Sequence, residues 1–236
     1  MYTENCNFKV ELLVHGRPIT EYLLGGDTFV EGRMGSEYEI RITNYSSRNA
    51  VAVVSVDGLS VMNGKPASRD ASGYVLEPFG NVIIPGWRLN NEGVAHFKFG
   101  ALPESYAEKQ GMPENVGAIG VVFFFERKAP EFLPNFDLRT KGIRPPVMYS
   151  AAPGSYSASI GTEFGRRTEH RVTNVNFDRE PSPAAELVLR YDEASNLESR
   201  GIRLIGSHVG RDAVREASPF PADIGCVPPR GWHRRK

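Results

Sequence analysis

The sequence has few of the features that mark a metalloprotein, a disulfide-stapled scaffold or a redox protein. It contains two cysteines in 236 residues, Cys6 and Cys226, and neither lies in a CxxC motif. Because they stand near opposite ends of the chain, a disulfide requires the termini to meet, and two free thiols are the simpler expectation. The five histidines form no HxH or HExxH ligand pair. We therefore expect no metal site and no cofactor.

Long apolar runs and an excess of one charge are also absent. The longest apolar run, residues 116–125, is interrupted by glycines and is far shorter than the roughly 20 residues of a membrane helix. The first residues are polar and acidic, unlike a signal peptide. Lys and Arg number 28, and so do Asp and Glu. A neutral chain argues against a dedicated nucleic-acid binder. We expect synthesis in the cytoplasm, with no cleaved signal and no membrane span.

Catalytic and nucleotide-binding signatures are missing as well. The chain has no GxSxG elbow, no GxxxxGK[ST] loop and no GxGxxG motif. The acids Glu31, Glu37, Glu39 and Glu77 leave open a hydrolase whose carboxylates come together only in the fold. Each of them is equally explained as part of a solvated strand face. The sequence favours a protein that is not an enzyme.

The first half of the chain consists of short strand patterns separated by tight turns rich in Gly, Asn, Asp and Pro. Apolar and polar residues alternate over residues 37–42 and 93–99, and Asn63-Gly64 is a strong hairpin signal. About eight to ten strands in such a length is typical of a jelly roll or an immunoglobulin-like domain. We expect an all-β fold, a jelly-roll or immunoglobulin-like antiparallel β-sandwich with a Pro-rich C-terminal extension. The expected strands are 8–14, 19–24, 29–31, 37–42, 50–56, 73–76, 81–84, 93–99 and 116–126, with a helical turn over 102–110.

The composition changes near Arg127. Residues 1–126 carry 10 Lys and Arg against 15 Asp and Glu, whereas residues 127–236 carry 18 against 13. Oppositely charged halves suit either docking of the second half on the first or contact between copies of the chain. The expected organisation is a β-sandwich domain at 1–126, a Pro- and Gly-rich connection at 127–170, further strands and a short helix at 171–206, and an extended basic tail at 207–236. Within the third part, strands are expected at 171–177, 185–191 and 202–205, and a helix at 192–200.

Candidate binding residues are the polar or large side chains expected near loop tips, where a rigid sandwich usually places its binding groups. They are Asp57, Lys65, Trp87 and Arg88. Tyr74, Phe79 and Trp87 suit either a sugar-binding groove or core and interface anchors. The end of the tail is a second candidate, an interaction segment formed by Arg230, Trp232, Arg234, Arg235 and Lys236.

Several of these turns belong to motifs that occur together. They are VEGR (30–33) with GSEY (35–38), SVDGLSV (55–61) with NGKPAS (63–68), GYVL (73–76) and IPGWRL (84–89). As a set they resemble an uncharacterised family of proteins encoded in bacterial and bacteriophage genomes. The resemblance covers residues 29–126. It implies that the turn motifs form one fixed structural unit, and it supplies no activity and no catalytic residue.

The sequence therefore favours a non-enzymatic structural or assembly protein. A rigid sandwich and a Pro-rich arm would suit a virion-associated or surface-layer subunit, whose partners are copies of itself or a larger protein assembly. Two alternatives stay open. One is a ligand-binding β-sandwich module, with carbohydrate as the ligand, and the other is a hydrolase with a non-contiguous carboxylate site.

Overall fold

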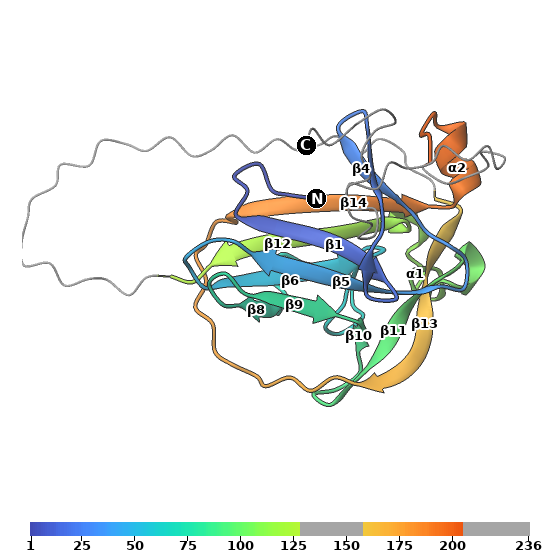
Figure 1. Ribbon diagram of the computed structural model, residues 1–236. Coiled ribbons are helices and arrows are strands. Elements are labelled where there is room, and N and C mark those ends of the chain that lie inside the picture. Colours follow the sequence, from blue (N-terminus) through green and yellow to red (C-terminus); the bar gives the residue numbers. More distant parts are fainter. Residues whose placement is uncertain (128–157, 205–236) are drawn as a thin grey trace, which may run out of the picture. The chain divides into compact units, whose positions relative to one another are not determined.

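We describe residues 1–127 and 158–204 of the protein from a computed structural model (Figure 1). In this part of the chain the strands form two seven-stranded sheets. The fold is an all-β sandwich, as the density of strand patterns predicted. Most of the expected connection (128–157), the expected basic tail with its candidate residues, and Cys226 lie outside the described residues.

Sheet 1 has the strand order β10-β11-β5-β1-β2, with β9 paired to β5 and β13 paired to β11. Its strands are β1 (Phe8–Val14), β2 (Arg17–Pro18), β5 (Glu37–Asn44), β9 (Asn81–Ile84), β10 (Gly86–Arg88), β11 (Gly93–Ala101) and β13 (Ile160–Glu169). All pairs in this sheet are antiparallel. The pairing of β11 with β13 shifts register between Ala95 and Phe97, which marks a bulge.

Sheet 2 has the order β3-β4-β14-β12-β6-β7, with β8 paired to β6. Its strands are β3 (Glu21–Leu24), β4 (Asp27–Glu31), β6 (Ala50–Val56), β7 (Leu59–Ser60), β8 (Tyr74–Leu76), β12 (Ala118–Phe125) and β14 (Ala185–Asp192). Figure 1 shows β14 beside β12, with which it pairs antiparallel. Its other neighbour, β4, runs parallel to it, so the sheet is not purely antiparallel.

The core lies between the two sheets because each strand turns alternate side chains inward. In β5 every second residue is buried, which matches the alternation that predicted it. The rings of Phe8 from sheet 1 and Phe123 from sheet 2 stack with centroids 4.1 Å apart. Each large apolar side chain that is fully buried in this way contributes roughly 1.5–3 kcal/mol.

The described residues contain four short helical segments. They are two 3₁₀ turns, η1 (Leu102–Glu104) and η2 (Pro113–Asn115), and two α-helices, α1 (Tyr106–Lys109) and α2 (Ala194–Ser199). The Ser105 hydroxyl caps α1 by accepting a hydrogen bond from the Glu108 amide at 3.1 Å. Leu197 of α2 packs with Phe29 and Ile202 in a separate apolar cluster beside β4.

Three expectations for the second half are wrong. Residues 160–169 form β13 and not a connection, and β13 and β14 complete the two sheets, so the sandwich does not end at residue 126. Residues 171–177 form no strand. Instead Phe177 packs on a second apolar cluster, formed by Val51, Val53, Val122 and Phe124 on strands β6 and β12. Residues 202–204 are not a strand either.

Candidate functional site

Asp57 is one of two aspartates in the described part of the chain, with Asp192, that are fully buried. Asp57 directly follows β6 with a positive φ of 52°, and Gly58 comes next with φ 75° to complete the tight turn into β7. Its Oδ1 accepts hydrogen bonds from the Gly117 amide at 2.9 Å and the Tyr191 hydroxyl at 2.6 Å. Its Oδ2 accepts one from the Thr162 amide at 2.8 Å. The turn is therefore bound to β12, β13 and β14 from inside the fold.

Hydroxyl groups extend this network across the core. Thr162 Oγ1 lies 2.7 Å from the Tyr191 hydroxyl and 2.8 Å from the Tyr38 hydroxyl. When Asp57 is ionised, each hydroxyl can donate toward it, in the order Tyr38, Thr162, Tyr191 and then the carboxylate. Such a chain of hydrogen bonds polarises cooperatively in a low-dielectric core.

Burial dominates the electrostatics of this network. It raises the pKa of Asp57 from 3.8 to about 6, although the hydrogen bonds from Tyr191, Thr162 and Gly117 oppose the shift. Burial, reinforced by the charge of Asp57, also holds the pKa of Tyr38 and of Tyr191 well above the ordinary value of a tyrosine. Asp57 lies in a turn, as predicted, but no part of the residue reaches the surface, so it is not the exposed binding group expected at a loop tip. It joins strands.

Trp87 is also inside the fold. It lies in β10 with 2% of its surface exposed, and its ring packs edge-on against Phe97 and Tyr106 at 5.3 and 5.1 Å between centroids. Of the two interpretations that the sequence left open, Trp87 is a core anchor and not an exposed loop-tip group, because Pro85 and Gly86 take part in the pairing with β11. A Cβ at Gly86 would lie 1.9 Å from the Ala95 carbonyl oxygen, so glycine is required for this close approach and not for a turn.

Arg88 follows in β10 and is half-buried. Its guanidinium lies over the Tyr74 ring at 5.8 Å and donates to the Tyr74 hydroxyl at 3.0 Å. It also donates to the His170 carbonyl oxygen at 2.5 Å and lies 2.7 Å from His170 Nδ1. Burial, and then the charge of Arg88, lower the pKa of His170. These contacts use Arg88 to join β8, β10 and the end of β13, which leaves it poorly placed to recognise a ligand.

Lys65 is the loop-tip candidate that the structure leaves exposed. Its amide donates to Asn63 Oδ1 at 3.0 Å, within the Asn-Gly turn after β7. Gly64 has a φ of 66°, as the hairpin signal predicted. The four candidates are therefore not brought together into one site, and the tail candidates lie beyond the described residues.

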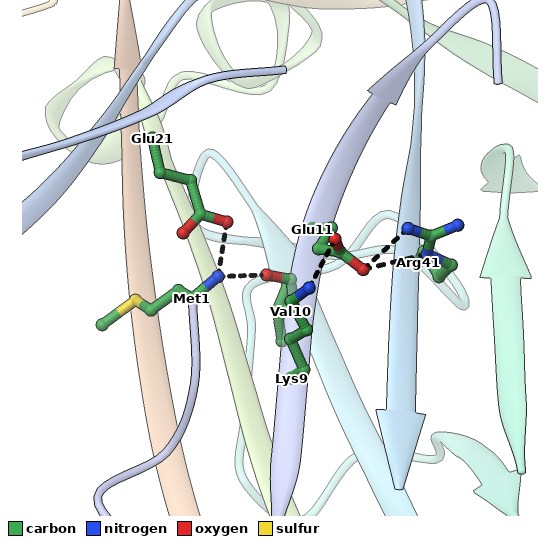
Figure 2. Close-up of polar contacts among 6 residues, drawn as sticks. All are labelled: Met1, Lys9, Val10, Glu11, Glu21 and Arg41. Atoms are coloured by element: carbon green, nitrogen blue, oxygen red, sulfur yellow. Dashed lines mark hydrogen bonds and ion pairs between the residues drawn. The ribbon is translucent and has the colours of Figure 1, made fainter. Parts of the chain in front are cut away.

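The outer face of sheet 1 carries a group of paired charges. Figure 2 shows Glu11 between Lys9 and Arg41, with Glu11 Oε1 at 2.8 Å from Lys9 Nζ and Glu11 Oε2 at 2.9 Å from Arg41 Nη2. Burial alone would raise the pKa of Glu11, but hydrogen bonds from both cations hold it below its usual value. On the same sheet Glu37 binds Arg166, with 3.0 Å between Oε2 and Nε, and lies 3.8 Å from His96 Nδ1. These carboxylates are paired with cations and do not face a second acid.

Over residues 1–127 and 158–204 there is no group of three or more His, Cys, Asp or Glu side chains arranged to hold a metal ion. No helix in the same ranges has the length and apolar character needed to cross a membrane. A surface pocket of about 330 Å³ lies where β11 begins and β13 ends, and no candidate residue lines it, although Arg88 binds the nearby His170 carbonyl oxygen. The pocket is lined by Glu92, Gly93, Arg167, Thr168, Glu169 and Arg171.

The open edge of β3 is a feature that the sequence analysis did not single out. β3 ends sheet 2, so one of its sides has no neighbouring strand in the described part of the chain. Leu23 at this edge is 81% exposed. In Figure 2 the Met1 α-amino group donates to the Val10 carbonyl oxygen at 2.7 Å and to the Glu21 carboxylate, which ties the start of β3 to β1. A strand was expected at 19–24, but only the strand order shows that β3 is an edge.

Comparisons with known proteins return no match: no family model fits the chain, and no curated protein or solved structure is significantly similar to it. The geometry of the described residues is therefore the basis for any functional proposal.

Proposed function

We propose that this protein is a non-enzymatic structural subunit that assembles with other copies of itself. The open edge of β3 is the observation that supports the proposal, because an unpaired strand edge with an exposed apolar side chain is a ready template for another chain. Proteins that stay monomeric usually blunt such edges. A virion or a surface layer is a setting in which such a rigid, self-assembling subunit would serve.

The other strand edges of the two sheets are blunted, shorter or less exposed. β10 has three residues, and β9, which pairs only with β5, is followed at once by Pro85 and has its Ile83 39% exposed, against 81% for Leu23. β2 has two residues and contains a proline, while β7 and β8 have two and three residues. β13 is longer, but it is bulged near Gly165, and its second half carries the charged side chains Arg166, Arg167 and Glu169. Against these, β3 has no proline, no lysine and no bulge. This difference between β3 and the other edge strands favours β3 as the edge that pairs with another chain.

The alternative functions have weaker support. A ligand-binding module relied on Asp57 and Trp87 as exposed groups, and both are buried. A carboxylate hydrolase needs two acids that face each other across a cleft. Glu37 instead binds Arg166, and Glu31 binds Arg33 with 2.9 Å between Oε1 and Nε.

Light scattering of the full-length chain over a range of concentration and salt tests the proposal. We expect a discrete oligomer or a larger assembly that dissociates on dilution. The opposite charge balance of residues 1–126 and 127–236 also predicts that salt weakens the assembly, because exposed charges are screened beyond about 10 Å at 0.1 M salt. A particle with the mass of one chain, 26.1 kDa, under all conditions would refute the proposal.

A further inference from the structure

We infer that the occupant of the β3 edge is the β3 strand of a second copy, paired antiparallel about a two-fold axis at Leu23, so that one sheet continues across two subunits. This inference rests on the proposed assembly function and adds the interface and its register. The argument starts from the direction of the backbone groups of β3.

The hairpin geometry determines which backbone groups of β3 are available. Gly25 and Gly26 have φ values of 62° and 92°, which make a two-residue turn of type I′ between Leu24 and Asp27. The residues that flank such a turn form a hydrogen-bonded pair, so the next pair, Leu23 and Thr28, is a non-hydrogen-bonded one. The N–H and C=O of Leu23 therefore point away from β4, toward the open side.

Alternation along the strand points the backbone groups of Glu21 to the same side. Two antiparallel registers then pair outward groups of both copies. One pairs only those of Leu23 and places Glu21 opposite the turn at Gly25, and the other pairs those of Leu23 and Glu21. In the first, Leu23 faces Leu23 of the second copy, and in the second it faces Glu21. The first register packs the exposed Leu23 side chain against its own copy, and it keeps the two Met1–Glu21 contacts apart. We therefore place the two-fold axis at Leu23.

Charge does not oppose this contact. Glu21 is paired with the Met1 α-amino group, and Asp27 lies 3.4 Å from Arg190 Nε. Two copies of the edge can then approach without bringing unpaired like charges together. β3 has only four residues, so the contact is smaller than a standard interface, and we expect dimers that dissociate on dilution.

The test uses the full-length chain and two exposed apolar positions. Leu23→Lys places a charge on the edge, a device that natural proteins use to prevent strand pairing. We expect it to raise the dissociation constant measured by sedimentation by about tenfold or more. The matched control is Val175→Lys, because Val175 is 62% exposed but lies outside every strand. We expect the control to associate as the unmodified chain does.

A cross-link tests the register and does not depend on Leu23→Lys folding. In a Cys6→Ser, Cys226→Ser background, Leu23→Cys should form a disulfide-linked dimer on mild oxidation. The Cα atoms of a hydrogen-bonded antiparallel pair lie about 5.5 Å apart, within the range of a disulfide. Val175→Cys in the same background should stay monomeric under denaturing, non-reducing conditions.

The outcomes separate the inference from the function on which it rests. If the unmodified chain assembles while Leu23→Lys assembles equally well and Leu23→Cys does not cross-link, the interface lies elsewhere and only the inference is overturned. If the unmodified chain is monomeric at every concentration, both fail. Loss of assembly in Leu23→Lys together with cross-linking at position 23 supports both.

Discussion

Replacing Asp57 by asparagine should change how the stability of the protein depends on pH. The folded protein holds a proton on Asp57 up to about pH 6, whereas the unfolded chain releases it near pH 3.8. Between these values the folded state binds more protons than the unfolded state. The contribution of Asp57 to the free energy of unfolding is therefore complete below pH 3.8, and it is lost as the pH rises through 6.

The size of the effect follows from the shift. A difference of about two pKa units at about 1.4 kcal/mol per unit amounts to roughly 3 kcal/mol. Asparagine has nearly the same shape but cannot ionise in this range. The stability of the wild-type protein minus that of Asp57→Asn should thus fall by roughly 2.5 kcal/mol between pH 4 and pH 7.5, because a small part of the change lies below pH 4. All other titrating groups are shared and cancel in the difference.

The hydroxyl chain explains how the core accommodates both states. When Asp57 is protonated it becomes a donor, and Tyr191, Thr162 and Tyr38 can reverse the direction of their hydrogen bonds. In asparagine the side-chain oxygen can keep the two donors of Oδ1, Gly117 and Tyr191, but the NH₂ group then faces the Thr162 amide. This mismatch lowers stability by about 1–3 kcal/mol at every pH and leaves the slope unchanged.

Urea unfolding at several pH values between 4 and 7.5, followed by circular dichroism, measures the two stabilities. Far-UV spectra before unfolding check that Asp57→Asn keeps the β fold. A difference that stays constant with pH would refute the argument. If the stability of wild type relative to Asp57→Asn instead grew with pH, the hydrogen bonds from Tyr191, Thr162 and Gly117 would outweigh the effect of burial. The pKa of Asp57 in the folded protein would then lie below 3.8.

Three further substitutions test other contacts of the sandwich. Tyr191→Phe removes a donor that opposes the rise in the Asp57 pKa, so urea unfolding should show a loss of about 1–2 kcal/mol that is larger at pH 7.5 than at pH 5; an equal loss at both values would contradict this. Glu11→Gln should cost about 1 kcal/mol at pH 7, and because the folded pKa of Glu11 is lowered, the difference from wild type should vanish as the pH falls below 4.5. Gly86→Ala drives a Cβ into the Ala95 carbonyl, so thermal unfolding should reveal a loss of about 3 kcal/mol or more, whereas Gly111→Ala, in open space but at a positive φ, should cost only about 1 kcal/mol.

The strands with regular alternation or dense β-branched content could be read from the sequence. The bounds of β1, β6 and β9 agree with the expected strands, because the inward side chains of each build the core directly. β13 could not be read in this way. Gly161 and Gly165 break its pattern, and packing requires both, since a Cβ would lie 2.5 Å from Ser105 Cβ at the first and 3.0 Å from the His96 carbonyl oxygen at the second.

The burial of Asp57 could not be predicted from the sequence, for a different reason. Asp57-Gly58 is a turn, as predicted, but turn chemistry does not reveal on which side of the sheet a carboxylate lies. Two of the donors that bury Asp57 come from residues 105 and 134 positions away, Thr162 and Tyr191. No local pattern contains that information. Likewise, the residues of β3 predict a strand but not that the strand has one open side.

The parallel pairing of β4 with β14 has a consequence for biosynthesis. Residues 27–31 are made early, but the strand with which they pair in parallel spans Ala185–Asp192. Asp57 likewise receives a hydrogen bond from Tyr191, which is made much later. In a nascent chain that has emerged only as far as residue 126, one side of β4 is therefore unpaired. The carboxylate of Asp57 also lacks the donors that come from later residues. Pairing over such sequence separations is slow, and it leaves strand edges exposed in the meantime. The sandwich can close only after translation has passed residue 192, so strand edges that the finished fold covers stay exposed during synthesis.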